Sequence, residues 1–328
     1  MTGPEISVAL CTHNGAEFVR EQVESILKQT VPPTQLVLSD DASTDNTVAI
    51  VEAAVGGWPE PRPELVVIRN PSPLGVVANF EQAVTRCTGD LIALCDQDDI
   101  WMPDKLMRFV ALFAAERDLP LAHSDATLVS AEGDPLPHPL LGSLEATPAE
   151  RERLTNGRSF DALIRRNLVT GATVVFRRTL LDRALPFPRS WVHDEWLAII
   201  AAAVSRTLLI DERLIDYRQH GGNQIGASKP GLADKLGKLR EPRSVRNRRL
   251  VARSVDVVDR LELLGAAVDP ARLTLARAKL AHERWRLALP ANPVLRAPRI
   301  VGAVLAGRYG RFSRGIRDAA RDLVQPAG

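Results

Sequence analysis

Three carboxylates stand within four positions at the end of an apolar run in this chain. Residues 91–95 are apolar, and Asp96, Asp98 and Asp99 follow them directly. Carboxylates held this close repel one another and resist ionisation unless a cation offsets their charge. Mg²⁺ and Mn²⁺ prefer oxygen ligands and commonly keep waters and substrate phosphates around them. The pattern therefore predicts metal-assisted chemistry on a phosphorylated ligand.

A second acidic pair, Asp40 and Asp41, follows the apolar run 35–39. Taken alone, residues 41–45 are typical of a turn with a helix cap. If both apolar runs are strands of one parallel sheet, their carboxyl ends meet at one edge and the two acidic clusters face one crevice. A carboxylate at Asp40 can accept the N3 hydrogen of uracil or thymine. Thr12 and Asn14, in the loop after the first strand, would then supply polar groups to the same base and its ribose.

Two histidine-containing motifs add candidates in the second half of the chain. Asp194 and Glu195 follow His193 at the start of a predicted helix, where His193 itself fits a helix-start residue bonded to the backbone. His220 lies in a glycine-flanked loop beside Arg218. A lone histidine is more often structural, yet this setting also suits a third metal ligand or a diphosphate contact.

Two tryptophans and one glycine remain open between two interpretations. Trp101 and Trp196 have aromatic faces that can stack on an acceptor sugar, and both fit core positions equally well. Gly171 interrupts a β-branched run, which permits close approach of either a ligand or a second backbone.

The elements that must position these residues alternate between strand and helix patterns, which is typical of a mostly parallel α/β sheet covered by helices. The predicted strands are 6–11, 35–39, 65–69, 91–95, 121–124 and 169–176. Predicted helices follow at 76–86, at 160–166 and over 191–204, where residues 191–196 open the helix and 197–204 form its apolar body. Others start after Asn14, after Ser43 or Thr44, and at Pro103. Asn14 is expected to cap its helix with Glu17 as the partner three residues later. Residues 131–148 are expected to form an exposed loop.

Three motifs, taken together, resemble the family 2 glycosyltransferases of GT-A fold. They occur in the usual order and cover, with their surroundings, about residues 5–225; they are 8–15 (VALCTHNG), 39–45 (SDDASTD) and 95–103 (CDQDDIWMP). The forms of residues 96–101, 193–196 and 217–223 further resemble the rhamnosyltransferase-like branch of that family.

The resemblance implies roles for the donor-binding residues. Asp40 matches the aspartate that binds the base, and Thr12 and Glu17 match the first loop that faces the nucleotide. Asp96 matches the residue that reaches the ribose or a water on the metal. Asp98 matches the direct metal ligand, which implies Mg²⁺ or Mn²⁺ as the cofactor.

The resemblance also implies a catalytic base. Asp194 matches the base of inverting members, while Glu195 is its rival because the motif here reads Asp-Glu-Trp. Asp99 is expected to orient its neighbours rather than bind. A metal on Asp98 would stabilise the diphosphate leaving group, and Asp194 would take the proton of the attacking hydroxyl. One base with no nucleophile opposite it predicts inversion by single displacement.

The resulting expectation is an inverting transferase that uses a UDP- or dTDP-sugar, with dTDP-rhamnose favoured by resemblance alone. The acceptor is expected to be a cell-envelope glycan or a lipid-linked sugar. A sugar nucleotidylyltransferase is one alternative, but it should open with a glycine-rich loop and a basic residue, which residues 10–15 lack. A non-catalytic nucleotide-sugar-binding protein is another, and the presence of both Asp98 and Asp194 argues against it.

Composition sets the remaining bounds. The chain has 328 residues, 45% of them hydrophobic and 25% charged, which is enough for one large domain and an appendage. No apolar run approaches the roughly 20 residues that span a bilayer. The N-terminal residues lack the basic lead of a secretory signal, and Cys11, Cys87 and Cys95 lie among apolar neighbours. These features predict a cytoplasmic protein with reduced thiols.

Charge is distributed unevenly along the chain. Residues 1–228 hold 20 Lys and Arg against 31 Asp and Glu, whereas residues 229–328 hold 22 against 9. This shift predicts a catalytic domain at 1–228 and a helical basic region at 229–328, with a boundary near Lys229. Such a region is expected to meet an anionic partner, either a membrane surface or nucleic acid.

The basic region favours a membrane over nucleic acid. Its first arginine-rich stretch, 243–253, fits a solvated helix face as well as a binding surface. Residues 294–305 and 309–323 place apolar residues among arginines, which suits peripheral attachment to an anionic membrane at the inner face of the cell. Nucleic acid is not expected as a partner, because few aromatics are present to stack bases and no known nucleic-acid-binding motif occurs.

Overall fold

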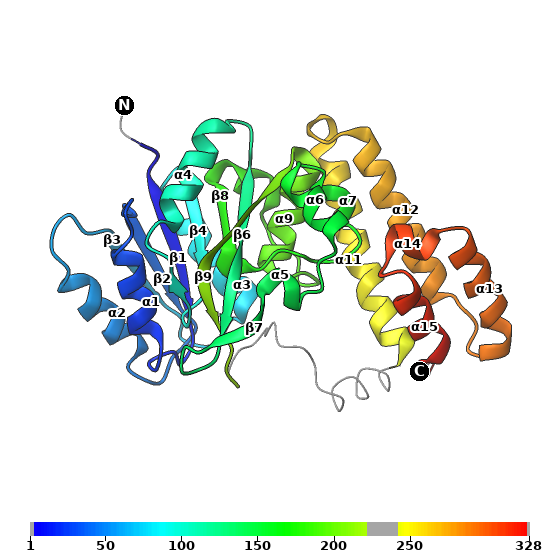
Figure 1. Cartoon of the computed structure of the whole chain (residues 1–328), viewed down its shortest axis with the longest axis horizontal. Helices are drawn as coiled ribbons and strands as arrows, with labels where there is room; N and C mark the ends of the chain where they lie inside the picture. The colour runs from blue at the N-terminus through cyan, green and yellow to red at the C-terminus, as the bar shows by residue number, and fades with distance from the viewer. Residues whose placement is uncertain (1–2, 222–241, 327–328) are drawn as a thin grey trace. The chain divides into compact units, whose positions relative to one another are not determined.

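A computed structural model of the chain describes residues 3–221 and 242–326 (Figure 1). These residues form two compact units. The first comprises residues 3–159, 168–201 and 205–221, and the second comprises 160–167, 202–204 and 242–326. The expected boundary near Lys229 lies outside the described residues, as do Gly222 and Asn223 of the last motif.

The first unit is built on one sheet, with nine strands in the described part of the chain. They are β1 (Ile6–Thr12), β2 (Gln35–Asp40), β3 (Glu64–Arg69), β4 (Leu91–Cys95), β5 (Ile100–Trp101), β6 (Leu121–Val129), β7 (Pro135–Pro139), β8 (Val174–Arg177) and β9 (Thr207–Arg218). The strand order is β3-β2-β1-β4-β8-β6-β9-β5, and β7 pairs with β6.

The sheet is parallel in its first half and mixed in its second. The order β3-β2-β1-β4 is parallel throughout, as the strand and helix alternation predicted. Beyond β4 the direction changes, because β8 runs antiparallel to both β4 and β6, while β9 runs parallel to β6. The parallel half places the carboxyl ends of β1, β2 and β4 side by side, which is where the acidic residues lie.

The helices and single turns connect these strands. They are α1 (Val19–Leu27), α2 (Thr47–Gly56), α3 (Val76–Arg86), α4 (Lys105–Ala115), α5 (Leu140–Ser143), α6 (Pro148–Thr155), α7 (Ser159–Leu163), η1 (Gly171–Thr173), η2 (Arg178–Leu180), α8 (Leu181–Ala184) and α9 (His193–Val204). The predicted helix 76–86 is confirmed at both ends. The helix predicted to start at Pro103 begins at Lys105, because the chain first forms the short strand β5.

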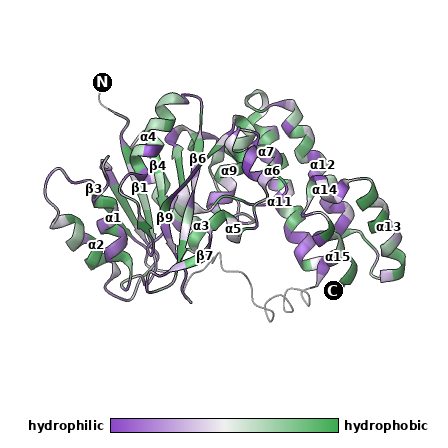
Figure 2. Cartoon of the chain, viewed as in Figure 1, coloured by the Kyte–Doolittle hydropathy of each residue, from purple (hydrophilic) through white to green (hydrophobic). Residues whose placement is uncertain are grey.

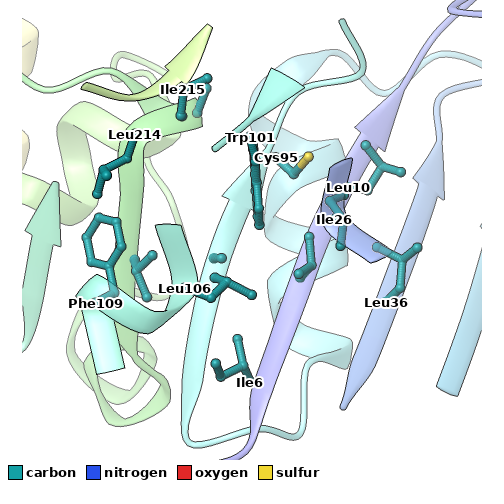
Figure 3. Close-up of a cluster of buried hydrophobic side chains, with 14 of the residues drawn as sticks. Ile6, Leu10, Ile26, Leu36, Cys95, Trp101, Leu106, Phe109, Leu214 and Ile215 are labelled. Atoms are coloured by element: carbon teal, nitrogen blue, oxygen red, sulfur yellow. The ribbon is translucent and has the colours of Figure 1, made fainter. Parts of the chain in front are cut away.

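The hydrophobic core of the first unit lies between the sheet and its covering helices. β1 and β4 are buried along their whole length, as expected for strands covered on both faces. Figure 3 shows Ile26 of α1 next to Leu10 of β1 and Leu36 of β2, while Phe109 of α4 lies near Leu106 and Leu214 in another part of the same core. This packing fixes the strands whose ends carry the acidic residues.

Two sequence predictions for the middle of the chain are wrong. Residues 131–148 are not a plain exposed loop, because β7 pairs with β6 and the two leucines at the start of α5, Leu140 and Leu141, are buried. Their proline and glycine content concealed this local structure. The strand predicted over 169–176 begins only at Val174, because residues 171–173 form the 3₁₀ turn η1.

The second unit is helical in its described residues. Its helices in the described part are α11 (Arg243–Leu264), α12 (Pro270–Leu287), α13 (Pro293–Leu305), α14 (Arg308–Phe312) and α15 (Ile316–Val324), with the turn η3 (Gly265–Ala267). A small apolar core contains Leu289, Ile300 and Tyr309. Beside it, Asp322 accepts hydrogen bonds from Arg286 at 2.7 Å, from Tyr309 at 2.8 Å and from Arg246.

Two further expectations concern the whole chain. None of the described helices has the length and apolar character that a bilayer crossing requires. Cys11, Cys87 and Cys95 are buried and free, as their apolar surroundings predicted.

Candidate active site

The loops that follow β1 and β2 are joined by hydrogen bonds. The side-chain oxygen of Asn14 accepts from the Thr44 N–H at 2.8 Å, and the Asn14 N–H donates to Ser43 Oγ at 2.8 Å. Each loop contains one residue with a left-handed backbone, Asn14 with φ 49° and Ala42 with φ 61°. Asparagine adopts this conformation readily, whereas for alanine it costs about 1–2 kcal/mol. The loops are therefore held in a specific conformation at the edge of the sheet.

Asp40, at the end of β2, holds this pair of loops together. Its Oδ1 accepts from Thr12 Oγ1 at 2.7 Å and from Ser43 Oγ at 2.5 Å, and its Oδ2 accepts from the Ser43 N–H at 2.9 Å. A carboxylate offers about four acceptor positions, so one remains for a ligand donor. Asp41 is similarly engaged, with the Leu74 N–H at 2.6 Å and the Gly75 N–H at 2.9 Å.

The predicted cap of the first helix is wrong. Helix α1 begins at Val19, and no side chain caps it. Glu17 lies exposed in the turn before the helix, where it cannot complete a capping box with Asn14. The reason is that the Asn14 side chain already bonds across to the second loop.

The predicted cap of the second helix is also wrong. Helix α2 begins at Thr47, after both Ser43 and Thr44. Asp45 takes the capping contact instead, since its Oδ1 accepts from the Thr47 N–H at 3.0 Å. Ser43 and Thr44 are used in the bonds between the two loops.

The acidic turn lies between β4 and β5, and the end of β9 closes it. β5 pairs with β9, which brings Arg218 beside the turn. The Arg218 N–H donates to Asp99 Oδ1 at 3.0 Å, and Arg218 Nε donates to the Asp98 carbonyl at 2.9 Å. Its guanidinium also donates to Glu21 at 2.6 Å. Arg218 and Asp99 therefore support the turn from within the protein.

His220 follows β9 and meets Asp98, with Nε2 and Oδ2 2.7 Å apart. Two ligands bound at right angles to an ion at about 2.1 Å lie about 3.0 Å apart, so a small outward shift would admit Mg²⁺ or Mn²⁺ between them. Among the described residues, no group of three or more His, Cys, Asp or Glu side chains converges on one point. The pair thus fits an ion whose other ligands are waters and diphosphate oxygens.

Electrostatics in the turn also fit a cation. Burial, followed by the charges of Asp98 and Asp194, raises the pKa of Asp96 to about 7. Burial, followed by the charges of Asp98 and Asp96, raises the pKa of Asp99. A divalent ion would offset this repulsion directly. Asp194 packs beside Gly171 of η1 (Gly171–Thr173), and η1 contacts β4, the strand that leads into the acidic turn.

Asp194 is the second residue of α9 and is buried. Burial, followed by the charge of Glu195, raises the pKa of Asp194 to about 7. Glu195 is only partly buried, and its N–H donates to Asp194 Oδ1 at 2.7 Å. A carboxylate whose pKa lies near neutrality suits general-base chemistry.

Gly171, in η1, leaves room for this carboxylate. A Cβ added at Gly171 would lie 3.1 Å from His193 Nε2 and 3.5 Å from Asp194 Oδ2. The expected backbone bond of His193 is not present among the described residues. Its ring instead stacks on Phe80 with centroids 3.8 Å apart, and burial lowers its pKa to about 3. His193 is therefore a neutral packing residue behind the base.

Trp101 and Trp196 occupy core positions. Both are buried, and Trp196 Nε1 donates to the Ala184 carbonyl at 2.8 Å. Trp101 packs with Ile26 and Leu106 in the main core (Figure 3). Of their two interpretations, the structure supports the core role.

Comparison with known proteins identifies the family. The model of glycosyl transferase family 2 matches residues 7–172, which is half of the chain and includes both acidic clusters. The chain belongs to glycosyl transferase family 2. An uncharacterized protein of Mycobacterium tuberculosis is 27% identical over 66% of this chain and 59% of its own, so the match spans about three fifths of that relative's length. An Escherichia coli UDP-Glc:alpha-D-GlcNAc-diphosphoundecaprenol beta-1,3-glucosyltransferase is 25% identical over 60% of this chain and 69% of its own.

Solved structures share the GT-A fold with this family 2 member. Staphylococcus aureus TarS 1–349 in complex with UDP-GlcNAc superposes with a TM-score of 0.57 at 20% identity, over 86% of this chain and 72% of that one. A mannosyltransferase of Pyrobaculum calidifontis in complex with GDP-Man and Mn²⁺ gives 0.54 at 17% identity, over 94% and 77%. The predicted GT-A architecture is thereby confirmed.

Two residues of the family 2 site escaped the sequence analysis. Gln97, between the two acidic residues of the turn, accepts from the His13 N–H at 2.8 Å and donates to the His13 carbonyl at 3.2 Å. Lys105 is fully buried, and its Nζ donates to the Ala172 carbonyl at 2.8 Å. Its position two residues after Pro103 carried no sign of burial. Only the short β5 strand, which was not predicted, turns it inward.

Proposed function

We propose that this chain is a metal-dependent inverting glycosyltransferase that moves a sugar from a nucleoside diphosphate to an acceptor hydroxyl. The observation that carries the proposal is the shared setting of Asp194 and the acidic turn. A buried carboxylate with a pKa of about 7 raises, by its charge, the pKa of Asp96 two residues from the metal candidate Asp98. Asp194 lies beside η1, and η1 contacts β4, the strand that leads into the acidic turn. A proton acceptor and a diphosphate-binding turn on neighbouring elements are the two parts that single displacement requires.

The donor side is assigned to the loops after β1 and β2. Asp40 keeps one acceptor position for the N3 hydrogen of uracil or thymine, and Thr12 holds that carboxylate in place. Asn14 and Glu17 line the outer part of the same loop, where they would meet the base and ribose. Asp96 lies between this loop and the metal candidates, which suits contact with the ribose or with a water on the metal.

The metal candidates are Asp98 and His220. Mg²⁺ or Mn²⁺ held there would neutralise the charge that develops on the departing diphosphate. The protein's own residues hold the site ready for it: Arg218 fixes the Asp98 carbonyl and the Asp99 carboxylate through hydrogen bonds. The ion bound in the Pyrobaculum structure is in accord with this proposal.

Asp194 acts as the base in this proposal, and Glu195 tunes it. Asp194 is buried beside η1, whereas Glu195 is partly exposed and raises the pKa of its neighbour. The proton of the acceptor hydroxyl passes to Asp194 as the hydroxyl oxygen attacks the anomeric carbon. The bond to the diphosphate breaks on the opposite face, which inverts the anomeric centre.

The donor sugar and acceptor follow from the motifs and relatives. The motif forms at 96–101 and 193–196 favour a rhamnose donor, and the named E. coli relative uses UDP-Glc on a diphosphoundecaprenol acceptor. We therefore place the acceptor among cell-envelope glycans and lipid-linked sugars.

A donor screen tests the proposal. In the presence of Mn²⁺, the unfolding temperature should rise on addition of a UDP- or dTDP-sugar and not of GDP-mannose. The donor that stabilises the protein should also be hydrolysed, and that hydrolysis should require the ion. Asp98→Asn should abolish the ion dependence, whereas Asp104→Asn, at an exposed carboxylate six residues away, should not. Donor hydrolysis that proceeds equally in Asp98→Asn would refute the metal site.

A further inference from the structure

Exposed apolar side chains gather on two helices of the second unit. On α13, Val294 is 77% exposed and Leu305 is 82% exposed, with Leu295 and Val301 exposed between them. On α15, Ile316 is 77% exposed, and Val324 is also exposed. Figure 2 shows hydrophobic residues on the visible side of α13. Large apolar groups in water at this density mark an interaction surface.

The exposed residues form a stripe along each helix. On α13, Val294, Val301 and Leu305 are separated by seven and four residues, so they lie on one side. The other side, with Ile300 and Ala303, packs into the core of the unit. On α15, Ile316 and Val324 are eight residues apart and face away from the buried Asp322. The two helices pack against each other, so the stripes belong to one structural element.

Exposed arginines lie on the same helices as these stripes and in the connection between the helices. Arg299 of α13 and Arg317 of α15 are exposed, as are Arg311 and Arg314 in the connection between them. Not every arginine of the region is available, however. Arg296 lies in the stretch 294–305 that was expected to attach to a membrane. Its side chain is instead buried and donates to the Leu323 carbonyl at 2.6 Å. The surface formed by the exposed arginines is thus narrower than the sequence suggested. It lies on, and between, the two helices that carry the apolar stripes.

We propose that α13 and α15 dock this protein onto an anionic lipid bilayer. Apolar stripes accompanied by exposed arginines suit the boundary between acyl chains and acidic headgroups, where the apolar residues insert and each arginine near the surface contributes about 1 kcal/mol. A second copy of the chain is a poorer occupant. A two-fold contact would bring the same positively charged surface of both copies together, and their charges would repel. The proposal is independent of the assigned chemistry, although a membrane surface would also present a lipid-linked acceptor.

Vesicle co-sedimentation of the full chain tests the proposal. Vesicles that contain phosphatidylglycerol should pellet the protein at low salt, with less binding at high salt and to pure phosphatidylcholine. Leu305→Glu and Ile316→Glu each remove one inserting group and add repulsion, so each should weaken binding at least about tenfold. Both positions are exposed, so the substitutions should leave the unfolding temperature unchanged.

Leu263→Glu is the matched control. Leu263 is 80% exposed but lies at the far end of α11, whose first residue, Arg243, bonds to the Pro326 carbonyl just after α15. At about 1.5 Å per residue, α11 separates Leu263 from that end by roughly 30 Å. Equal losses in Leu263→Glu and Leu305→Glu would overturn the proposal, as would absence of binding to phosphatidylglycerol at low salt. A dimer in sedimentation velocity that Leu305→Glu dissociates would also overturn it, by assigning the stripes to a second copy.

Discussion

At the scale of single residues, the environment of Asp194 makes a prediction about pH. A base must be deprotonated, and burial together with Glu195 raises the pKa of Asp194 to about 7. The charge of Glu195 raises the pKa of Asp194, the charge of Asp194 in turn raises the pKa of Asp96, and burial keeps His193 neutral. We therefore expect kcat/KM to rise about tenfold per pH unit below pH 7 and to level above it.

Substitutions at this pair of carboxylates separate the base from its neighbour. Asp194→Asn should lower kcat by about 10²–10⁴-fold at every pH. Glu195→Gln should keep most of the activity and move the midpoint of the pH profile to lower pH, because it removes a charge that raises the pKa of Asp194. If Glu195→Gln instead lowered kcat more than Asp194→Asn does, Glu195 would be the base.

Lys105 carries a second prediction at this scale. Its Nζ donates to the Ala172 carbonyl at 2.8 Å and lies 3.5 Å from the centre of the Trp101 ring. Lys105→Met would leave that buried carbonyl without its donor, which costs about 1–3 kcal/mol of unfolding free energy. Lys28→Met replaces an exposed lysine paired with Glu24, so it should change the unfolding free energy by less than about 1 kcal/mol. Denaturant unfolding of both variants measures the difference.

At the scale of elements, the close contact between the β1 loop and the acidic turn makes Gly15 irreplaceable. A Cβ at Gly15 would lie 2.3 Å from Gln97 Oε1, the atom that accepts from the His13 N–H. Gly15→Ala should therefore push the Gln97 side chain aside, break its two hydrogen bonds to the His13 backbone and lower kcat/KM by up to about 10²-fold. Gly56→Ala, at the end of α2 where an added Cβ meets nothing, should have no such effect. Steady-state kinetics that are equal for both variants would contradict this view of the loop.

The same elements show how far sequence reasoning reaches. Strands β2 and β4 and helix α3 were predictable because their apolar periodicity is strong, and each ends close to a carboxylate or a turn residue. The caps were not predictable, because Asn14, Ser43 and Thr44 serve a contact between two loops that are about thirty residues apart in sequence. The same applies to Gln97 and Lys105, whose partners lie 84 and 67 residues away.

At the scale of the whole molecule, the two units depend on different kinds of interior. The first is held by a large apolar core between sheet and helices, whereas the second combines a small apolar core with buried ion pairs. Part of the positive charge that the sequence assigned to a surface is internal, namely Arg243, Arg246, Lys279, Arg286 and Arg296. Arg246 and Arg286 both bond to Asp322, whose side chain is fully buried. Such pairs contribute little when intact, but removing one partner leaves a buried charge uncompensated.

Asp322→Asn should for this reason unfold the second unit before the first. Loss of the carboxylate removes the buried ion pair of Arg246, while Arg286 keeps its pair with Glu283 at 2.9 Å. Breaking a buried pair in this way costs about 3–5 kcal/mol, which is a large share of the stability of a unit of this size. The proposed donor site consists of residues of the first unit alone, so Mn²⁺-dependent stabilisation by the donor should persist in the later transition. Differential scanning calorimetry should show one early transition that the donor leaves unmoved and one that it raises. A single unfolding transition whose temperature rises on addition of the donor would show instead that the two units unfold together.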